Sequence, residues 1–294
     1  MKTAEFRGNR RYLTGAAKLA GVVGYPITHS LSPRLHGAWI EAAGLDAAYV
    51  PLAPDEPGFE SLIEGFRGGV FSGVNVTLPF KERALHLADV ADPLARMAGA
   101  ANLLLFRKDG SIEARNTDGE GLLYALRQQA PHWKADMGPV TVLGAGGAAR
   151  GAVAALSLAG AANIRVLNRT MGRAEALSAL LPCKAFDWKD ATAAFDGVMT
   201  LINATSGQLE GASELPLPEK AVSPDAVAMD MVYTPLATPF LIATNQKGFL
   251  PVDGLDMLIG QARPSFEAMF GIAPPNELDA RALLLGALND APKG

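Results

Sequence analysis

The sequence VTVLGAGGAA at residues 140–149 is the clearest indication of architecture in this chain. Its first four residues, Val140–Leu143, predict a short buried strand, and the alanine-rich segment behind the glycines predicts a helix. Between them, Gly144, Gly146 and Ala149 fit the pattern GxGxxG/A. The first glycine of this pattern permits a tight turn, the second lets a diphosphate approach the backbone, and the small third residue lets the helix lie close to the strand. The stretch therefore predicts a dinucleotide-binding α/β unit, with a tight turn that holds no ligand as the alternative.

The next predicted strand, Ile164–Leu167, leads into a polar segment that bears on cofactor choice. It is followed by Asn168, Arg169 and Thr170, with Arg173 just beyond. A site that prefers NAD usually has Asp or Glu at this strand end, to hold the ribose 2′-hydroxyl. Here the position is neutral, and guanidinium groups match a 2′-phosphate well. The segment therefore favours NADP over NAD; arginines that merely solvate a helix start are the alternative.

Two further strand ends in this half of the chain carry polar residues. The segment 203–207 follows a strand predicted over Val198–Ile202, and the segment 230–233 ends a strand predicted to begin at Ala226. Ligands of open α/β sheets bind at the carboxyl ends of the strands. Both segments are therefore candidates for a nicotinamide pocket, although each is also consistent with a helix cap or a core methionine.

A second chemical signal lies earlier, in the sequence VNVTLPFK at residues 74–81. Asn75 and Thr77 alternate with apolar residues, so they share one face of the strand predicted over Phe71–Val76. Lys81 follows where a helix is predicted to begin. Such a cluster can bind a hydroxyl-rich small molecule and place an amine beside it; a surface strand end with a solvated lysine is the alternative.

The overall composition narrows the function classes. The 294 residues are 49% hydrophobic and 19% charged, and strand and helix patterns alternate along the chain, which predicts a globular α/β protein with a parallel sheet. A net charge of −4 gives no electrostatic case for nucleic acid, and no apolar run predicts a membrane helix. Cys183 is the only cysteine and the histidines lack paired spacing, so we predict no metal site and a reducing, cytoplasmic location.

Taken together, the ordered motifs resemble the shikimate dehydrogenase family over nearly the whole chain, from Gly21 to about Leu285. The resemblance implies an α/β protein of two domains: an N-terminal α/β substrate domain and a Rossmann-type doubly wound domain that binds NADP. We expect the first to comprise residues 1–117 and 255–294, with the C-terminal helices returning to it, and the second residues 118–254. The motifs are GYPIxHSLSP (24–33), NVTxPxK (75–81), NTDG (116–119), the glycine loop, NRTxxR (168–173), NATS (203–206) and DGxxMLxxQ (253–261).

The resemblance also implies roles for individual residues, in the reduction of 3-dehydroshikimate to shikimate and its reverse. Lys81 and Asp118 are the expected catalytic pair. The expected substrate-binding residues are Ser30, Ser32 and Tyr233 for the carboxylate, and Asn75, Thr77, Asn102 and Gln261 for the ring hydroxyls. The expected NADP-binding residues are Gly144, Gly146, Gly147, Ala148, Asn168, Arg169, Thr170, Arg173, Thr205, Ser206, Met231 and Gly254.

The chemistry of ketone reduction explains the expected catalytic pair. Negative charge builds on the ketone oxygen, so a neighbouring ammonium stabilises it and can donate the proton. We therefore assign proton transfer to Lys81, with Asp118 orienting the amine and a substrate hydroxyl. One departure from the family pattern is Leu103, where the family usually has Thr after the asparagine.

Three other functions stay open at this stage. A quinate or quinate/shikimate dehydrogenase is the nearest alternative, although Ser30 and Ser32 and the arginines of the second half favour shikimate and NADP. A non-catalytic NADP-binding sensor would not need Lys81 together with Asp118. A dehydrogenase with the same two-domain plan and another substrate is the broadest alternative. The expected partner is the small-molecule substrate, and the chain is expected to be a monomer or a homodimer.

Overall fold

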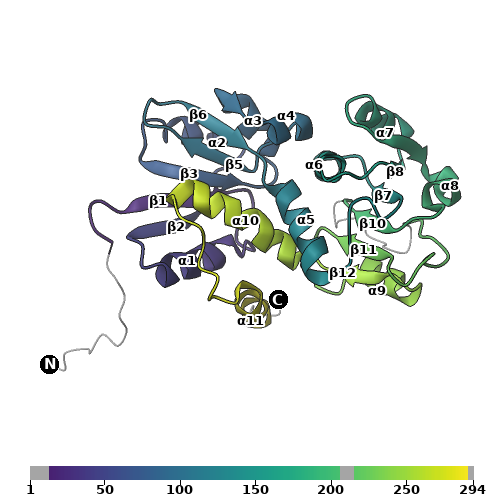
Figure 1. Ribbon diagram of the computed structural model, residues 1–294. Helices are drawn as coiled ribbons and strands as arrows, with labels where there is room; N and C mark the ends of the chain where they lie inside the picture. Colours follow the sequence, from purple (N-terminus) through teal and green to yellow (C-terminus); the bar gives the residue numbers. More distant parts are fainter. Residues whose placement is uncertain (1–12, 206–214, 291–294) are drawn as a thin grey trace.

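The computed structural model describes residues 13–205 and 215–290, which form two six-stranded sheets with helices around them (Figure 1). The first sheet has the order β2-β1-β3-β5-β6-β4. Strand β1 pairs in parallel with β2 and β3, whereas β5 pairs antiparallel with β3 and β6. Its elements are β1 (Lys18–Val23), α1 (Ser32–Ala42), β2 (Ala47–Leu52), α2 (Gly58–Glu64), β3 (Phe71–Val76), α3 (Lys81–Leu87), β4 (Val90–Ala91), α4 (Pro93–Ala98), β5 (Leu103–Phe106) and β6 (Ile112–Arg115).

The second sheet has the order β12-β11-β10-β7-β8-β9, and all its strand pairs are parallel. This is the strand order of a doubly wound dinucleotide-binding sheet, so the predicted fold class is confirmed. Its elements are β7 (Val140–Leu143), α6 (Gly147–Leu158), β8 (Ile164–Asn168), α7 (Met171–Ser178), β9 (Lys184–Asp187), the 3₁₀ turn η1 (Trp188–Asp190), α8 (Ala191–Phe195), β10 (Thr200–Asn203), β11 (Val227–Asp230), α9 (Pro239–Gln246) and β12 (Leu250–Val252).

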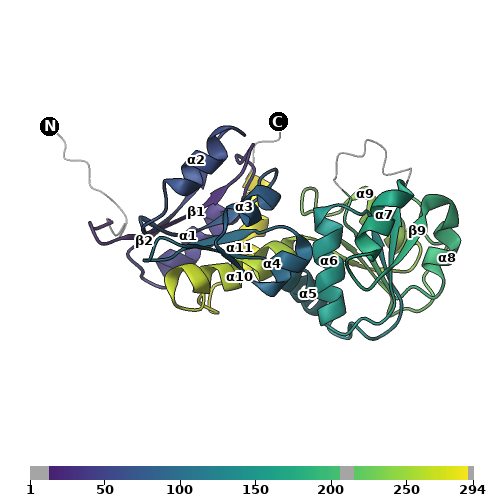
Figure 2. The ribbon, with the colours of Figure 1, turned by 90° about the horizontal axis from the view of Figure 1, so that it is seen from above.

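Helix α5 (Asp118–Gln129) lies at the junction of the two halves of the molecule, and α10 (Leu255–Phe270) starts there and runs along the first sheet, as Figure 2 shows from above. The two helices cross at Gly121 and Gly260, where there is no room for side chains. A Cβ atom on Gly121 would lie 2.5 Å from the carbonyl oxygen of Met257, and one on Gly260 would lie 2.5 Å from the Cβ of Tyr124. The two glycines therefore set how closely the two halves of the molecule approach.

The C-terminal helices return to the first sheet, as the sequence predicted. Ile259 and Phe266 of α10 belong to one apolar core with Trp39 of α1 and Leu103 of β5. Leu284 joins that core from α11 (Ala280–Asp290). Burial of these apolar side chains is the main force that holds the C-terminal segment against the N-terminal sheet.

The start of α1 and the edges of the two sheets carry weak local signals. Leu31 occupies the capping position of α1, and Ser32 is the first helical residue. Strands β4 and β9 were not predicted, because both lie at a sheet edge and neither has a buried apolar face. Among the described residues, no helix is long and apolar enough to span a bilayer, and no cluster of His, Cys, Asp and Glu has the makeup of a metal site.

Candidate active site

The predicted catalytic pair forms a direct contact. The Nζ atom of Lys81, the first residue of α3, lies 2.7 Å from Oδ2 of Asp118, the first residue of α5. Their side chains are 27% and 23% exposed, so the pair is sheltered but reachable from solvent. The backbone N–H of Ala101 donates to the carbonyl oxygen of Lys81 at 2.9 Å and ties the start of α3 to the sheet. An ammonium and a carboxylate are therefore held together at one edge of the first sheet.

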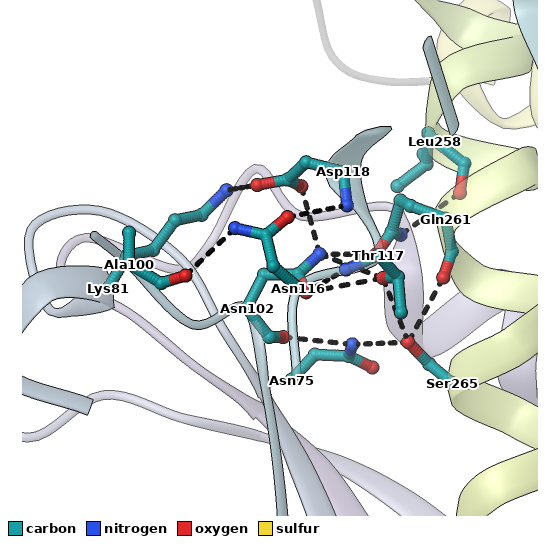
Figure 3. Close-up of polar contacts among 10 residues, drawn as sticks. All are labelled: Asn75, Lys81, Ala100, Asn102, Asn116, Thr117, Asp118, Leu258, Gln261 and Ser265. Atoms are coloured by element: carbon teal, nitrogen blue, oxygen red, sulfur yellow. Dashed lines mark hydrogen bonds and ion pairs between the residues drawn. The ribbon is translucent and has the colours of Figure 1, made fainter. Parts of the chain in front are cut away.

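Asn102 is the centre of the hydrogen-bond network around this pair (Figure 3). Its side-chain Nδ2 donates to Oδ1 of Asp118 and to Oγ1 of Thr117, both at 2.9 Å. Its Oδ1 accepts from the backbone N–H of Thr117 at 2.8 Å. Asn102 thus holds Oδ1 of Asp118 and leaves Oδ2 to Lys81.

Asn116 sets the backbone that carries the catalytic carboxylate. It donates from Nδ2 to the carbonyl oxygen of Ala100 at 2.9 Å, and its Oδ1 accepts from the N–H of Asp118 at 3.0 Å. The side chain of Asn102, through the N–H of Thr117, and the side chain of Asn116, through the N–H of Asp118, therefore fix the backbone that carries the carboxylate.

A deeper layer joins the strand end of β3 to helix α10. Nδ2 of Asn75 donates to Oγ of Ser265 at 2.9 Å, and Oγ of Ser265 donates to the carbonyl oxygen of Gln261 at 3.0 Å. The Gln261 side chain lies at the same place, with its Oε1 at 3.4 Å from Nδ2 of Asn102 (Figure 3). The structure therefore brings Asn75, Asn102 and Gln261 together with the catalytic pair.

The predicted carboxylate-binding residues lie at the neighbouring carboxyl end of β1. The N–H of Ser32 donates to Oγ of Ser30 at 3.3 Å, within the turn that leads into α1. The N–H of Thr77 donates to the carbonyl oxygen of Val23, which places the end of β3 beside that turn. Tyr233 reaches it from the second half of the chain and packs against the first core; burial raises its pKa, and a backbone hydrogen bond with Leu31 offsets part of the rise.

The glycine loop fits a diphosphate. Gly144 has φ +103°, and a Cβ there would lie 3.2 Å from the carbonyl oxygen of Ala204, so only glycine suits the turn. Side chains added at Gly146 or Gly147 would meet nothing within 4 Å. Helix α6 has no side-chain cap, so the first N–H groups, including that of Ala148, remain available to a phosphate.

Of the predicted 2′-phosphate residues, Asn168 at the end of β8 is partly buried, whereas Arg169, Thr170 and Arg173 just beyond it are exposed. Nδ2 of Asn168 donates to the carbonyl oxygen of Thr170 at 2.9 Å and holds the turn. Within residues 13–205 and 215–290, neither Arg169 nor Arg173 forms an ion pair with a carboxylate. The guanidinium of Arg169 lies 6.0 Å from the ring centroid of Trp188. Both arginines are thus available to an anionic group.

The residues predicted for the nicotinamide end are adjacent as well. Oγ1 of Thr205 donates to Oδ1 of Asn203 at 2.7 Å, at the carboxyl end of β10. A Cβ on Gly254 would lie 2.8 Å from the carbonyl oxygen of Met231, so these two backbones touch. Ser206 lies outside the described residues.

Sequence reasoning missed several supporting residues. Asn116 and Thr117 belong to the NTDG motif, but no role was predicted for them. Ser265 lies four residues after Gln261, hence on the same face of α10, and this spacing could have predicted that both face the site. Tyr49, whose hydroxyl donates to Oδ1 of Asn75 at 2.8 Å, had no signal, because only the pairing of strands brings it there.

Comparison with known proteins agrees with this geometry. Residues 22–104 match the substrate-binding domain of shikimate dehydrogenase, and residues 126–215 match the shikimate/quinate 5-dehydrogenase family. The chain is 53% identical over 281 residues to shikimate dehydrogenase (NADP(+)) of Caulobacter vibrioides, covering 95% of this chain and 98% of that protein. It is 46% identical over 271 residues to the enzyme of the same name from Paracoccus denitrificans, covering 92% and 96%.

Solved structures are similar over the same extent. Shikimate 5-dehydrogenase from Thermus thermophilus, crystallised with NADP(H) and shikimate, superposes with a TM-score of 0.81 at 36% identity, covering 92% of this chain and 99% of that one. Quinate dehydrogenase from Corynebacterium glutamicum has a TM-score of 0.81 at 24% identity, covering 92% and 99%, a likeness of fold alone.

Proposed function

The chain belongs to the shikimate dehydrogenase family, and on that premise we propose that it catalyses the reversible, NADP-dependent reduction of 3-dehydroshikimate to shikimate. The observation that carries the proposal is the contact of 2.7 Å between Lys81 Nζ and Asp118 Oδ2, made inside the network of Asn102. Relatives that are 43–53% identical are named NADP(+)-dependent shikimate dehydrogenases. A reaction on a ring ketone requires this kind of site: a proton donor among groups that bind hydroxyls.

The chain's own residues handle the proton. When bound, NADPH supplies the hydride to the ketone carbon. The ammonium of Lys81 stabilises the negative charge that develops on the ketone oxygen and then gives that oxygen its proton. Asp118 keeps the amine in place through its Oδ2, while Asn102 holds its other oxygen. In the reverse reaction Lys81 takes the proton from the hydroxyl of shikimate.

Substrate binding follows from the two clusters around the pair. Ser30 and Ser32, together with Tyr233, which contacts the backbone of Leu31 between them, bind the carboxylate. Asn75, Asn102 and Gln261, which lie close together, and Thr77 at the end of β3 bind the ring hydroxyls. Leu103, at the position where the family usually has threonine, is fully buried in the core of the first sheet. Its side chain therefore leaves the proposed hydroxyl contacts to Asn102.

The choice of NADP rests on the exposed guanidinium groups of Arg169 and Arg173, together with Asn168 and Thr170 at the end of β8. Glycines 144, 146 and 147 and Ala148 hold the diphosphate, and Thr205, Met231 and Gly254 border the nicotinamide. The domain assignment is also a proposal: residues 1–117 and 255–294 form the substrate domain and 118–254 the NADP domain. The cores support it, because Leu122 of α5 packs with the second sheet and Ile259 of α10 with the first.

The deciding experiment measures initial rates with shikimate and quinate, each with NADP and NAD. The proposal expects the highest kcat/KM for shikimate with NADP. A preference for quinate with NAD would assign the chain to the quinate branch. No change in absorbance of the reduced nicotinamide with any of these pairs would favour a non-catalytic sensor. Size-exclusion chromatography with light scattering would decide between the predicted monomer and homodimer, and the single Cys183 fits the proposed cytoplasmic location.

A further inference from the structure

Asn75 makes three hydrogen bonds that together define its chemistry. Its Nδ2 donates to Oγ of Ser265 at 2.9 Å and to the backbone carbonyl oxygen of Asn102 at 3.2 Å. Its Oδ1 accepts from the hydroxyl of Tyr49 at 2.8 Å. An amide has two N–H donors and an oxygen with two lone pairs, so both donors are occupied and one lone pair is left.

The orientation of this amide follows from its neighbours. A rotation of the amide by 180° would place Oδ1 against the carbonyl oxygen of Asn102, which can only accept hydrogen bonds. Asn75 is 5% exposed, so such a repulsive contact would have no water to relieve it. Asn75 therefore offers a ligand one acceptor and no donor.

Tyr49 is itself held firmly. Its ring stacks on His36, with centroids 4.1 Å apart and planes 2° apart, and both side chains belong to the core of the first sheet or line it. Burial lowers the pKa of His36 to about 3, so the imidazole stays neutral beside the tyrosine. Burial raises the pKa of Tyr49 well above its usual value, and a hydrogen bond with Ser32 opposes that rise. The Tyr49 hydroxyl thus lies near Ser32 and donates to the amide that we assign to a ring hydroxyl.

From this geometry we infer that Tyr49 is a positioning residue for substrate recognition, which makes Asn75 an acceptor that recognises a ring hydroxyl and disfavours a keto oxygen at the same point. The inference rests on the proposed function and deepens it. Three groups hold the Asn75 amide: Tyr49 donates to its Oδ1, and Ser265 and the carbonyl oxygen of Asn102 accept from its Nδ2. The ring hydroxyl that Asn75 recognises takes no part in the hydride transfer. Its contact with Asn75 should therefore contribute equally to binding of the ground state and of the transition state.

The variant Y49F removes one hydroxyl and keeps the ring against His36. We expect KM for shikimate to rise about 3- to 10-fold, as for loss of one neutral hydrogen bond. We expect kcat and the KM for NADP to stay within about 2-fold of the wild-type values. The lost contact contributes equally to ground-state and transition-state binding, so its removal weakens substrate binding without slowing the chemical step. The matched control is Y124F. Tyr124 lies on α5, and its hydroxyl has no hydrogen-bond partner among residues 13–205 and 215–290. That control should leave all these constants unchanged.

A double-mutant cycle tests whether Tyr49 acts through Asn75. N75A alone should raise KM for shikimate, and Y49F should add nothing further in the N75A background. A rise in KM of the same size in both backgrounds, or no rise in Y49F alone, would overturn the inference. Thermal unfolding of each variant checks folding; should Y49F fail to fold, the cycle of S265A with N75A replaces it, with the same expectation. An inactive wild-type protein would overturn the proposed function, whereas an active wild type with unchanged KM in Y49F would overturn this inference alone.

Discussion

Replacement of Lys81 by alanine is the most direct test of the catalytic assignment. The variant removes the ammonium that contacts Asp118 at 2.7 Å and leaves the contact between Asp118 and Asn102 in place. Loss of a positioned proton donor costs about 10²- to 10⁴-fold in turnover, which corresponds to about 3 to 5 kcal/mol of transition-state stabilisation. Because hydroxyl and carboxylate contacts are formed by other residues, KM for shikimate should change little.

The effect on stability should be much smaller than the effect on turnover. The two side chains are 27% and 23% exposed, so their attraction is screened by nearby water. Ion pairs of this kind contribute about 0–1 kcal/mol to folding. The free energy of unfolding of K81A should therefore stay within about 1 kcal/mol of the wild type. Loss of activity can then be separated from loss of structure.

The assay is the initial rate of NADPH formation from shikimate at saturating NADP, with urea unfolding of the same preparations. K108A is the control, since Lys108 is exposed in the turn between β5 and β6. Added primary alkylamines should restore part of the activity of K81A and none to the control, because they replace the missing amine. Turnover of K81A within about 3-fold of wild type would remove Lys81 from proton transfer and refute the reasoning.

Three other predictions concern pH, packing and cofactor choice. Burial lowers the pKa of His36 from 6.5 in the unfolded chain to about 3 in the folded protein, so the unfolded state binds a proton first as the pH decreases. The free energy of unfolding should therefore be highest above pH 6.5 and fall by about 1.4 kcal/mol per pH unit below it. H36F should flatten that slope in urea titrations between pH 6.5 and 4. G260A places a Cβ 2.5 Å from that of Tyr124 and should destabilise the protein by about 1–3 kcal/mol. The control G286A on α11, with nothing within 4 Å of the new Cβ, should be neutral or slightly stabilising. Equal melting temperatures of the two variants would contradict the tight crossing. R169A should lower kcat/KM with NADP by about 10-fold or more and leave that with NAD nearly unchanged, so a parallel loss with both cofactors would show that Arg169 does not contact the 2′-phosphate.

Much of the second half could be predicted from local sequence. A buried parallel strand shows as a short apolar run, and Val140–Leu143 is buried at every position. The glycine loop encodes a turn through backbone conformation, as the φ of +103° at Gly144 illustrates. Strand β9 escaped prediction because an edge strand of four half-exposed residues has no comparable apolar signature.

The candidate site was predicted residue by residue but not as an arrangement. The family resemblance indicated Lys81 and Asp118, and the structure placed them in contact. It did not indicate Tyr49 or Ser265, which act on Asn75 from β2, two strands away across β1, and from a helix 190 residues away. Long-range contacts of this kind depend on sheet register and helix packing, which no local pattern specifies.

By itself, the sequence determined most elements and their chemistry: which segments are buried strands, where a diphosphate can approach the backbone, and which amine and carboxylate are available. Only the tertiary structure decided which of these groups meet. Periodicity and turn chemistry act over a few residues, whereas Lys81 and Asp118 are 37 positions apart and are joined by the strands and helices between them. The close crossing at Gly121 and Gly260 then brings α10, with Gln261 and Ser265, to the same place, because only helices without side chains at that point can pack so tightly.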